Sequence, residues 1–553
     1  MSNPRGNKSA KTSPTATDRR ILGTITSGSL LSGLEAKLAD GVDVEDIRIG
    51  TFAVVEGGKN RFFSLLKDVS LASTNEDILL TPPTDEFARD VHFGVSTYYK
   101  LSLQPMLIGE MSEPDKPPAP SATVPPHFSP VYEATSEDVE RVFGREGIFH
   151  PAIGKPLFMD VPVCLDLEKF AKRSNALFGM SGCGKSALAR IILGYLVKTD
   201  KFVNLVFDMH NEFGWTATSE DGESVDSLRK LLGRKISIFT LDPRSPLYSH
   251  GQVYDYEVQI PLGEIGSADI ELLGSELALS PVQRETIYKL EDRWGDKNWL
   301  ARLLEIGDEE VRETAEELGL TSADTLRALC RKLGRFKRLD FLKEKPADDA
   351  VRRIREHVQA GKHVVIQFGQ YSDLLSYILV ANVLTRRLHA DYAKETDAAR
   401  AKGQQGPTPL IITIEEAHKF LDPSIAHSTI FGTIAREARK YHMVLFLIDQ
   451  RPSAIDDEVL SQVGTRIIGK LDDERDIDAA LSGRPNRGTL KVLVNNMVER
   501  QFLLTGYALP MPVVIDAKDY GAFCGEMEAA GGRMKEELER KRLDLSKDDE
   551  IEL

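Results

Sequence analysis

The chain has 553 residues, of which 41% are hydrophobic and 28% are charged, and its formal net charge is −15. This length supports several domains, and the acidic balance counts mildly against a polyanionic ligand unless basic residues gather in the pore of an assembly. No apolar run approaches the roughly 18 residues that span a bilayer, and the N-terminus has no apolar secretory segment. We therefore expect a cytoplasmic protein without a membrane anchor.

Cysteine usage excludes two common kinds of small scaffold. The four cysteines, Cys164, Cys183, Cys330 and Cys524, are far apart and form no C-x-x-C pair. This spacing argues against a zinc ribbon and against a disulfide framework. We expect four reduced thiols.

The N-terminal part predicts a tail, a barrel and a linker. Residues 1–19 are rich in polar residues and proline, and they predict a disordered tail because they cannot offset the entropy of ordering. Residues 20–110 carry short β-type runs punctuated by glycine, which predict a small β-barrel. These runs are 21–26, 34–38, 52–56, 61–66 and 91–95. Seven prolines within 111–131 predict an extended linker.

The rest of the chain predicts an α/β core with an insertion. Apolar β-rich runs alternate with helical patterns over 132–261 and 346–516, which is typical of a parallel sheet covered by helices on both faces. Residues 262–345 have helical periodicity alone and predict a helical insertion. Residues 517–553 predict a charged C-terminal helix and tail, exposed or docked on a partner. The predicted core strands are 203–208, 235–240, 363–368, 410–414, 443–448 and 465–469.

The strongest motif is the G-x-x-x-x-G-K-S phosphate loop at Gly179–Ser186, between an apolar run and a helical pattern. Its glycines allow backbone N–H groups to surround a phosphate, Lys185 adds positive charge, and the Ser186 hydroxyl can bind Mg²⁺. An ordinary glycine-rich turn is the alternative. The predicted ATP contacts are Gly179, Ser181, Gly182, Cys183, Gly184, Lys185, Ser186 and Ala187. For Cys183 we favour packing in a tight loop over a redox role.

Paired acids follow the apolar run 410–414. Glu415 and Glu416 would stand at the carboxyl edge of the sheet, where open α/β sheets bind ligands. We expect Glu415 to support Mg²⁺ through water and Glu416 to polarise the attacking water. A strand that ends in solvated acids is the alternative.

Three further residues complete the predicted catalytic set. Gln450 follows the next apolar strand, and its amide suits a sensor of the γ-phosphate because it both donates and accepts. Arg436 and Arg439 lie on the preceding helical segment, and in a ring such arginines reach the nucleotide of a neighbouring subunit. Surface salt bridges are the alternative for both.

Two polar clusters remain open to interpretation. Asp208, His210 and Glu212 end another strand and suit zinc ligands. Because no matching Cys/His cluster exists in the sequence, we favour a supporting role around Mg²⁺. A basic cluster in the insertion suits phosphate contacts or a solvated helix face. This cluster is Arg331, Lys332, Arg335, Lys337 and Arg338.

Together these motifs resemble the HerA branch of the HerA/FtsK ATPases. The similarity runs from about residue 21 to 516 and rests on 179–186, 208–213, 414–418, 435–440 and 450–453, with 23–28 and 52–57 resembling the small barrel of the family. It implies a RecA-like P-loop ATPase core that uses ATP and Mg²⁺. It also implies a homo-hexameric ring that moves double-stranded DNA beside a NurA-like nuclease in end processing, or beside an effector in antiviral defence.

The sequence departs from the family pattern at three positions. Glu415 replaces a common Asp, Asn211 replaces a usual glycine, and Ala438 stands where Gly often precedes Arg-Lys. None of these changes removes a group that the mechanism requires.

Other ATPase families fit less well. DEAH-box helicases need a Ser-Ala-Thr motif after the acid strand, whereas the one here, 121–123, precedes the phosphate loop. The segment 481–485 resembles a transporter signature but follows the acid strand instead of preceding it. The remaining alternative is an ATP-binding scaffold ring that assembles or regulates a partner effector with little translocation.

Overall fold

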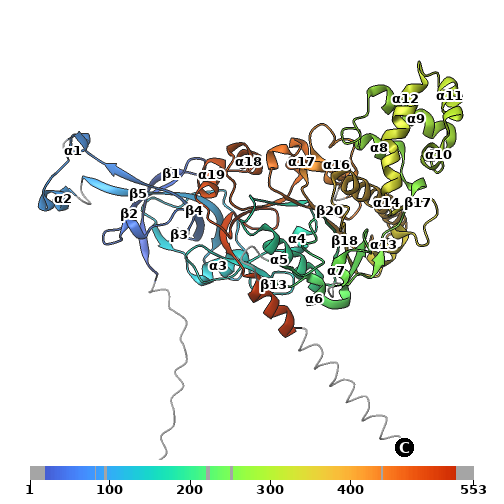
Figure 1. Ribbon diagram of the computed structural model, residues 1–553. Coiled ribbons are helices and arrows are strands. Elements are labelled where there is room, and N and C mark those ends of the chain that lie inside the picture. The colour runs from blue at the N-terminus through green and yellow to red at the C-terminus, as the bar shows by residue number, and fades with distance from the viewer. Residues whose placement is uncertain are drawn as a thin grey trace, which may run out of the picture. The chain divides into compact units, whose positions relative to one another are not determined.

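The computed structural model describes residues 19–80, 82–92, 96–218, 224–249, 253–437 and 440–530 (Figure 1). The chain divides into two compact units, the first comprising 1–145 with 156–163 and the second comprising the remainder. No helix within these described ranges is long and apolar enough to cross a bilayer.

The first unit contains the predicted barrel. Its strands are β1 (Ile21–Ser29), β2 (Gly33–Leu38), β3 (Phe52–Glu56), β4 (Asn60–Ser73), β5 (Thr97–Glu110), β6 (Ala119–Pro120) and β7 (Pro130–Glu133). The order β2-β1-β7-β3-β4-β5 closes where β5 pairs with β2, which gives six strands in the barrel, and β6 is added outside on β5. Inward-facing apolar residues, among them Ile25, Ala36 and Val55, form its core.

The barrel extends past the predicted boundary at residue 110. Strand β7, which the sequence analysis split between the linker and the core, lies between β1 and β3 and closes the barrel. Helix α3 (Ser136–Phe143) also belongs to the first unit. From the predicted tail, Arg19 is described, and it is held by ion pairs with Glu56 and Asp138; residues 1–18 lie outside the described ranges.

One predicted strand of the barrel is wrong. Residues 91–92 end helix α2 (Glu86–His92), which follows α1 (Glu76–Leu80) between β4 and β5. The Asp85 carboxylate accepts the N–H of Ala88 at 2.8 Å and starts this helix. Residues 93–95 lie outside the described ranges.

The second unit is built on a large sheet and confirms the α/β class. Its strands run in the order β15-β14-β18-β11-β19-β20-β10-β21-β22-β23-β8-β9, and neighbours from β15 to β21 are parallel. The bounds are β8 (Ala152–Pro156), β9 (Val163–Cys164), β10 (Asn175–Phe178), β11 (Val203–Asp208), β14 (Ile236–Thr240), β15 (Tyr256–Glu257), β18 (His363–Gln367), β19 (Leu410–Glu415), β20 (Met443–Asp449), β21 (Thr465–Ile468), β22 (Gln501–Gly506) and β23 (Val513–Ala517). Strands β10, β11, β19 and β20 are buried throughout, which explains why they read as continuous apolar runs.

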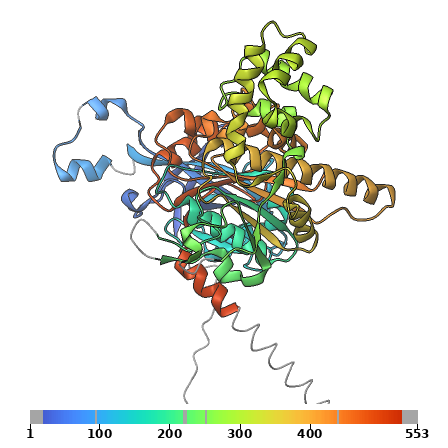
Figure 2. The same ribbon diagram turned by 45° about the vertical axis from the view of Figure 1, so that its right-hand side comes forward.

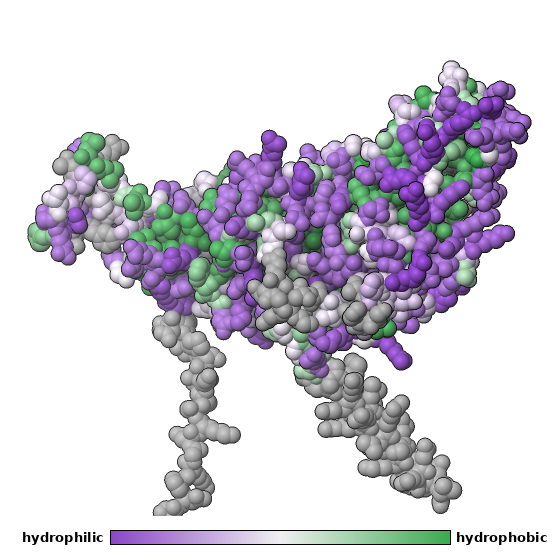
Figure 3. All heavy atoms as spheres, in the orientation of Figure 1, coloured by the Kyte–Doolittle hydropathy of each residue, from purple (hydrophilic) through white to green (hydrophobic). Residues whose placement is uncertain are grey.

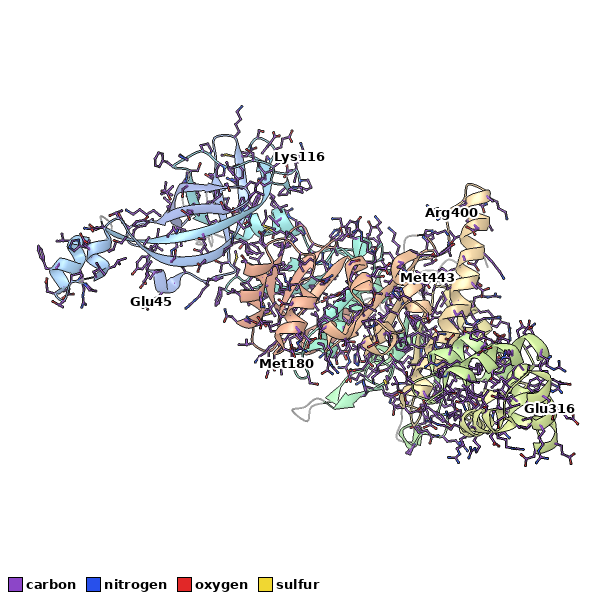
Figure 4. The ribbon with its side chains drawn as sticks, turned by 90° about the horizontal axis from the view of Figure 1, so that it is seen from above. Glu45, Lys116, Met180, Glu316, Arg400 and Met443 are labelled. Carbon is purple, nitrogen blue, oxygen red and sulfur yellow. The ribbon has the colours of Figure 1, made fainter. Side chains whose placement is uncertain are left out.

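Helices surround this sheet. They are α4 (Leu167–Phe170), α5 (Lys185–Lys198), α6 (Leu228–Leu232), α7 (Pro246–Ser249), α13 (Ala350–Gln359), α14 (Leu374–Ala401), α15 (His418–Leu421), α16 (Ile430–Glu437), α17 (Asp457–Gln462), α18 (Glu474–Ala480) and α19 (Arg487–Asn495). The long helix α14 runs out beyond the sheet in Figure 2, and Arg400 marks its far end in Figure 4. Residues 520–530 form a further helix after β23.

The helical insertion is present where it was predicted. Strands β16 (Ile260–Pro261) and β17 (Leu342–Lys343) pair at its base. The helices between them are α8 (Ser267–Leu272), α9 (Pro281–Trp294), α10 (Trp299–Glu305), α11 (Asp308–Glu317) and α12 (Ala323–Leu333). Within the basic cluster, Lys332 donates to Gln283 and to the carbonyl of Ala278, and Arg335 donates to the carbonyl of Glu276. These two cations therefore brace the insertion itself.

Candidate nucleotide-binding site

The phosphate loop joins the central strand β10 to helix α5. Gly182 and Gly184 have φ angles of 76° and 93°, the left-handed region that glycine adopts without strain. A Cβ on Gly179 would lie 2.6 Å from the Cys183 sulfur. The glycines therefore let the backbone curl tightly in front of the N-terminus of α5.

Lys185 lies between the loop and a group of acids. Its Nζ donates to the carbonyl of Met180 at 2.7 Å, and Figure 4 labels Met180. Burial lowers the pKa of Lys185, while the nearby thiol of Cys183 and the carboxylates of Glu416, Asp449 and Glu212 act in the opposite direction. The ammonium is thus held near the acids by a contact that a phosphate can replace.

Cys183 is buried within the loop. Burial raises the pKa of its thiol above the usual range, although Lys185 partly offsets this. A protonated, buried sulfur fits the packing role predicted for Cys183.

Adjacent strands bring carboxylates to one edge of the sheet. Asp208 ends β11, Glu415 ends β19 and Asp449 ends β20, and these strands stand next to one another beside β10. Glu415 is 6% exposed, and burial, followed by the charges of Asp208 and Glu212, raises its pKa well above the usual range. Clustered carboxylates of this kind fit a divalent cation, since oxygen ligands are those that Mg²⁺ prefers.

Glu416 and Gln450 face each other. The Gln450 amide donates to Glu416 Oε1 at 3.4 Å, and the two residues directly follow the neighbouring strands β20 and β19. Glu416 has a φ of 49°, a left-handed conformation that is uncommon outside glycine and is found at functional sites. The structure therefore brings together the two residues that we predicted to orient water and to sense the γ-phosphate.

A histidine and an aspartate that the sequence analysis did not select lie beside Glu416. The buried carboxylate of Asp449 accepts the backbone N–H of His418 at 2.7 Å and that of Arg451 at 2.7 Å. His418 Nδ1 lies 3.0 Å from Asp449 and 3.8 Å from Glu416, and the bond to Asp449 raises the pKa of His418. The sequence offered one signal for Asp449. It is the only polar residue of β20, and it stands directly before Gln450.

The cluster at 208–212 does not form a zinc site. Both oxygens of Asp208 are taken by the backbone N–H groups of Glu212, Phe213 and Gly214, at 2.7 to 3.0 Å. His210 is exposed. Asp208 instead fixes the loop that presents Glu212, whose buried Oε2 has no hydrogen-bond partner among the described residues.

The two predicted arginines have different outcomes. Arg436 lies at the end of α16 and is half-buried, and its buried Nη1 finds no hydrogen-bond partner in the described part of the chain. Arg439 lies outside the described residues.

Comparisons with known proteins point to one family. The model of the family "Helicase HerA, central domain" matches residues 150–388, which include the phosphate loop and the 208–213 loop. The DNA double-strand break repair helicase HerA of Saccharolobus solfataricus is 24% identical over 85% of this chain and 87% of its own length. The HerA of Sulfolobus acidocaldarius is 23% identical over 94% of this chain and 97% of its own length. The family model and these relatives support the assignment of this chain to the HerA family.

Two solved structures align with parts of this chain at low identity. VirB4 of Thermoanaerobacter pseudethanolicus is 13% identical, with a TM-score of 0.41 over 66% of this chain and 96% of its own. The bacterial conjugative coupling protein TrwB is 11% identical, with a TM-score of 0.43 over 69% of this chain and 91% of its own.

The buried acids predict a pH-dependent stability effect. The folded-state pKa of Glu415 is raised, so its charge lowers stability above that pKa, and this cost vanishes as the pH falls below the unfolded value. Without nucleotide, Glu415→Gln should therefore raise the melting temperature by about 2 °C or more at pH 7.5 and have little effect at pH 4.5. Thermal unfolding followed by circular dichroism tests this, with the exposed Glu458→Gln as control. Equal effects of Glu415→Gln at both pH values would contradict it.

Proposed function

We propose that this protein is a HerA-type, ATP-driven double-stranded DNA translocase or helicase that works as a homo-hexameric ring. The observation that carries the proposal is the convergence of Lys185, Glu416 and Gln450 from three different elements beside a phosphate loop. Phosphoryl transfer to water requires a loop that binds phosphate, a carboxylate that orients the attacking water and an amide that senses the γ-phosphate.

Each group has a defined task in hydrolysis. The loop N–H groups and Lys185 hold the phosphates, and Lys185 leaves the Met180 carbonyl to do so. Glu416 accepts a hydrogen bond from the attacking water, and Gln450 exchanges its bond to Glu416 for one to the γ-phosphate. Ser186 and, partly through water, Glu415 would hold Mg²⁺, which when bound neutralises charge on the phosphates.

We infer the DNA substrate, the ring and the partner protein from the relatives and not from the geometry of the site. The relatives carry the name DNA double-strand break repair helicase, which supports DNA as the substrate that is moved. We include a NurA-like nuclease or a defence effector as partner on the same ground.

The second candidate function is a scaffold ring that assembles a partner. It is favoured by the arm between β4 and β5, where large apolar side chains stand in solvent and appear green over α1 in Figure 3. Leu71, Leu80 and Phe87 are each about four-fifths exposed. Exposed apolar groups of this kind mark interaction surfaces.

The decisive test of the proposed function is whether linear double-stranded DNA accelerates ATP turnover. We expect stimulation of the wild type, loss of turnover in Glu416→Gln with ATP binding retained, and loss of tight ATP binding in Lys185→Ala. Lys201→Ala, on the surface, is the matched lysine control. Turnover that ignores DNA while a partner still binds would favour the scaffold ring.

If a neighbouring subunit supplies an arginine to each site, rings that mix two inactive mutants should regain activity. If Arg436 or Arg439 completes the neighbouring site, hydrolysis requires assembly, and an arginine acting in trans contributes about 10³-fold or more in rate. Mixing subunits carrying Arg439→Ala with subunits carrying Glu416→Gln should then give more activity than the sum of the two separate mutants, and the same mixture is made with Arg436→Ala. No rescue with either arginine, in rings shown to be mixed by native mass spectrometry, would return both to surface roles.

A further inference from the structure

The loop that presents Glu212 is held from a second side. Arg190, on helix α5, is 6% exposed, and its Nε donates to the carbonyl of Glu212 at 2.8 Å. The Arg190 guanidinium also lies over the ring of Tyr520, 5.6 Å from its centroid. A planar guanidinium suits this double use because it donates in its plane and stacks through its face.

Tyr520 begins the helix at 520–530, the red helix that lies beside α5 and α6 in Figure 1. Its hydroxyl donates to the carbonyl of Asp226 at 2.8 Å, in addition to the stacking of the ring on Arg190. Phe523 packs on α5, where a Cβ on Gly194 would come within 2.4 Å of its ring. Glu526 accepts hydrogen bonds from Tyr195 at 2.9 Å and from Lys198 at 3.3 Å. Residues 520–526 of this helix are therefore docked on the helix that follows the phosphate loop.

Tyr520 contacts Arg190, and Arg190 contacts Glu212. The carboxylate of Glu212 lies in the candidate nucleotide site. Glu212 contributes to the raised pKa of Glu415 and acts on Lys185, and its buried Oε2 has no hydrogen-bond partner among the described residues. A buried carboxylate oxygen without a donor is costly unless a cation or a bound water meets it. The position of the Glu212 backbone decides where that oxygen points.

We propose that the helix at 520–530 is a positioning element of the ATP site. Tyr520 fixes Arg190, Arg190 fixes the backbone of Glu212, and Glu212 thereby keeps its carboxylate facing the acids and Lys185, where it orients the divalent cation or its water. The inference rests on the proposed function and adds a regulatory route to it. A partner or ligand that displaces this helix would therefore loosen the 209–214 loop without contacting the nucleotide.

Paired substitutions at one position test the route in the full chain. Tyr520→Ala removes the ring from Arg190, whereas Tyr520→Phe keeps the ring and loses only the bond to Asp226. We expect Tyr520→Ala to lower kcat about 10-fold, the low end for loss of a group that orients a metal-site residue, with the Kd for ATP nearly unchanged. Tyr520→Phe should stay close to wild type.

A double-mutant cycle shows whether the effect passes through Glu212. In a Glu212→Gln background, Tyr520→Ala should cause little further loss, because the carboxylate that it positions is already absent. The second measurement is Mn²⁺ affinity, by electron paramagnetic resonance, with a non-hydrolysable ATP analogue bound. Tyr520→Ala and Glu212→Gln should each weaken Mn²⁺ binding, and the double mutant should match the stronger single effect.

The outcomes separate the two proposals. Additive losses in the cycle, or Mn²⁺ binding that Tyr520→Ala leaves unchanged, would overturn the positioning role. If Tyr520→Ala does not fold, Arg190→Lys, which keeps the charge and loses the planar guanidinium, takes its place in the same cycle. A wild type without ATP turnover would instead defeat the proposed function, while the Mn²⁺ cycle would still judge the positioning of Glu212.

Discussion

The crowding of buried carboxylates at the carboxyl edge of the sheet is the constraint on which the rest of the site depends. Asp208, Glu415 and Asp449 end neighbouring strands, and Glu212 and Glu416 follow close by. Like charges in a poorly solvated site repel, and burial raises the pKa of Asp208 to about 6. Such an arrangement lowers the stability of the free protein and becomes favourable when positive charge enters.

Hydrogen-bond donors and a lysine near these carboxylates stabilise part of their negative charge. Three backbone N–H groups surround Asp208, and two backbone N–H groups and His418 contact Asp449. Lys185 lies near Glu416 and Glu212. Glu416 keeps its Oε1 near the amide of Gln450. The Glu212 Oε2 atom has no hydrogen-bond partner among the described residues, and Glu415 accepts the backbone N–H of His210 at 3.4 Å. This crowding supports our proposal that a magnesium-bound nucleotide binds here, because positive charge would reduce the repulsion among the acids.

The sequence alone predicted that the phosphate loop, the acid pair and Gln450 meet at one edge of the sheet. The phosphate loop, the acid pair and Gln450 each follow an apolar run, and parallel strands bring their ends to one edge, so their meeting was predictable without coordinates. The closing strand β7 was missed because four residues in a proline-rich stretch carry too little pattern, and its pairing with β1 and β3 comes from tertiary closure. The strand expected at 91–95 failed because a local cap at Asp85 favours a helix.

Long-range contacts between side chains could not be predicted. Arg190 and Tyr520 are 330 positions apart in the chain, and neither belongs to a motif. Their contact depends on the docking of the last described helix on α5, which only folding determines. The roles of Asp208 and Glu212 were likewise separable only once the backbone N–H groups around Asp208 were visible.

A structure of the full chain with Mg²⁺ and a non-hydrolysable ATP analogue tests the central claim most directly. The account predicts that the phosphates lie in the 179–186 loop and that Lys185 Nζ has left the Met180 carbonyl for the β- and γ-phosphates. It also predicts that the metal lies between Ser186 and Glu415. Lys185 still bound to Met180, with the nucleotide elsewhere or with the metal away from Glu415, would contradict it.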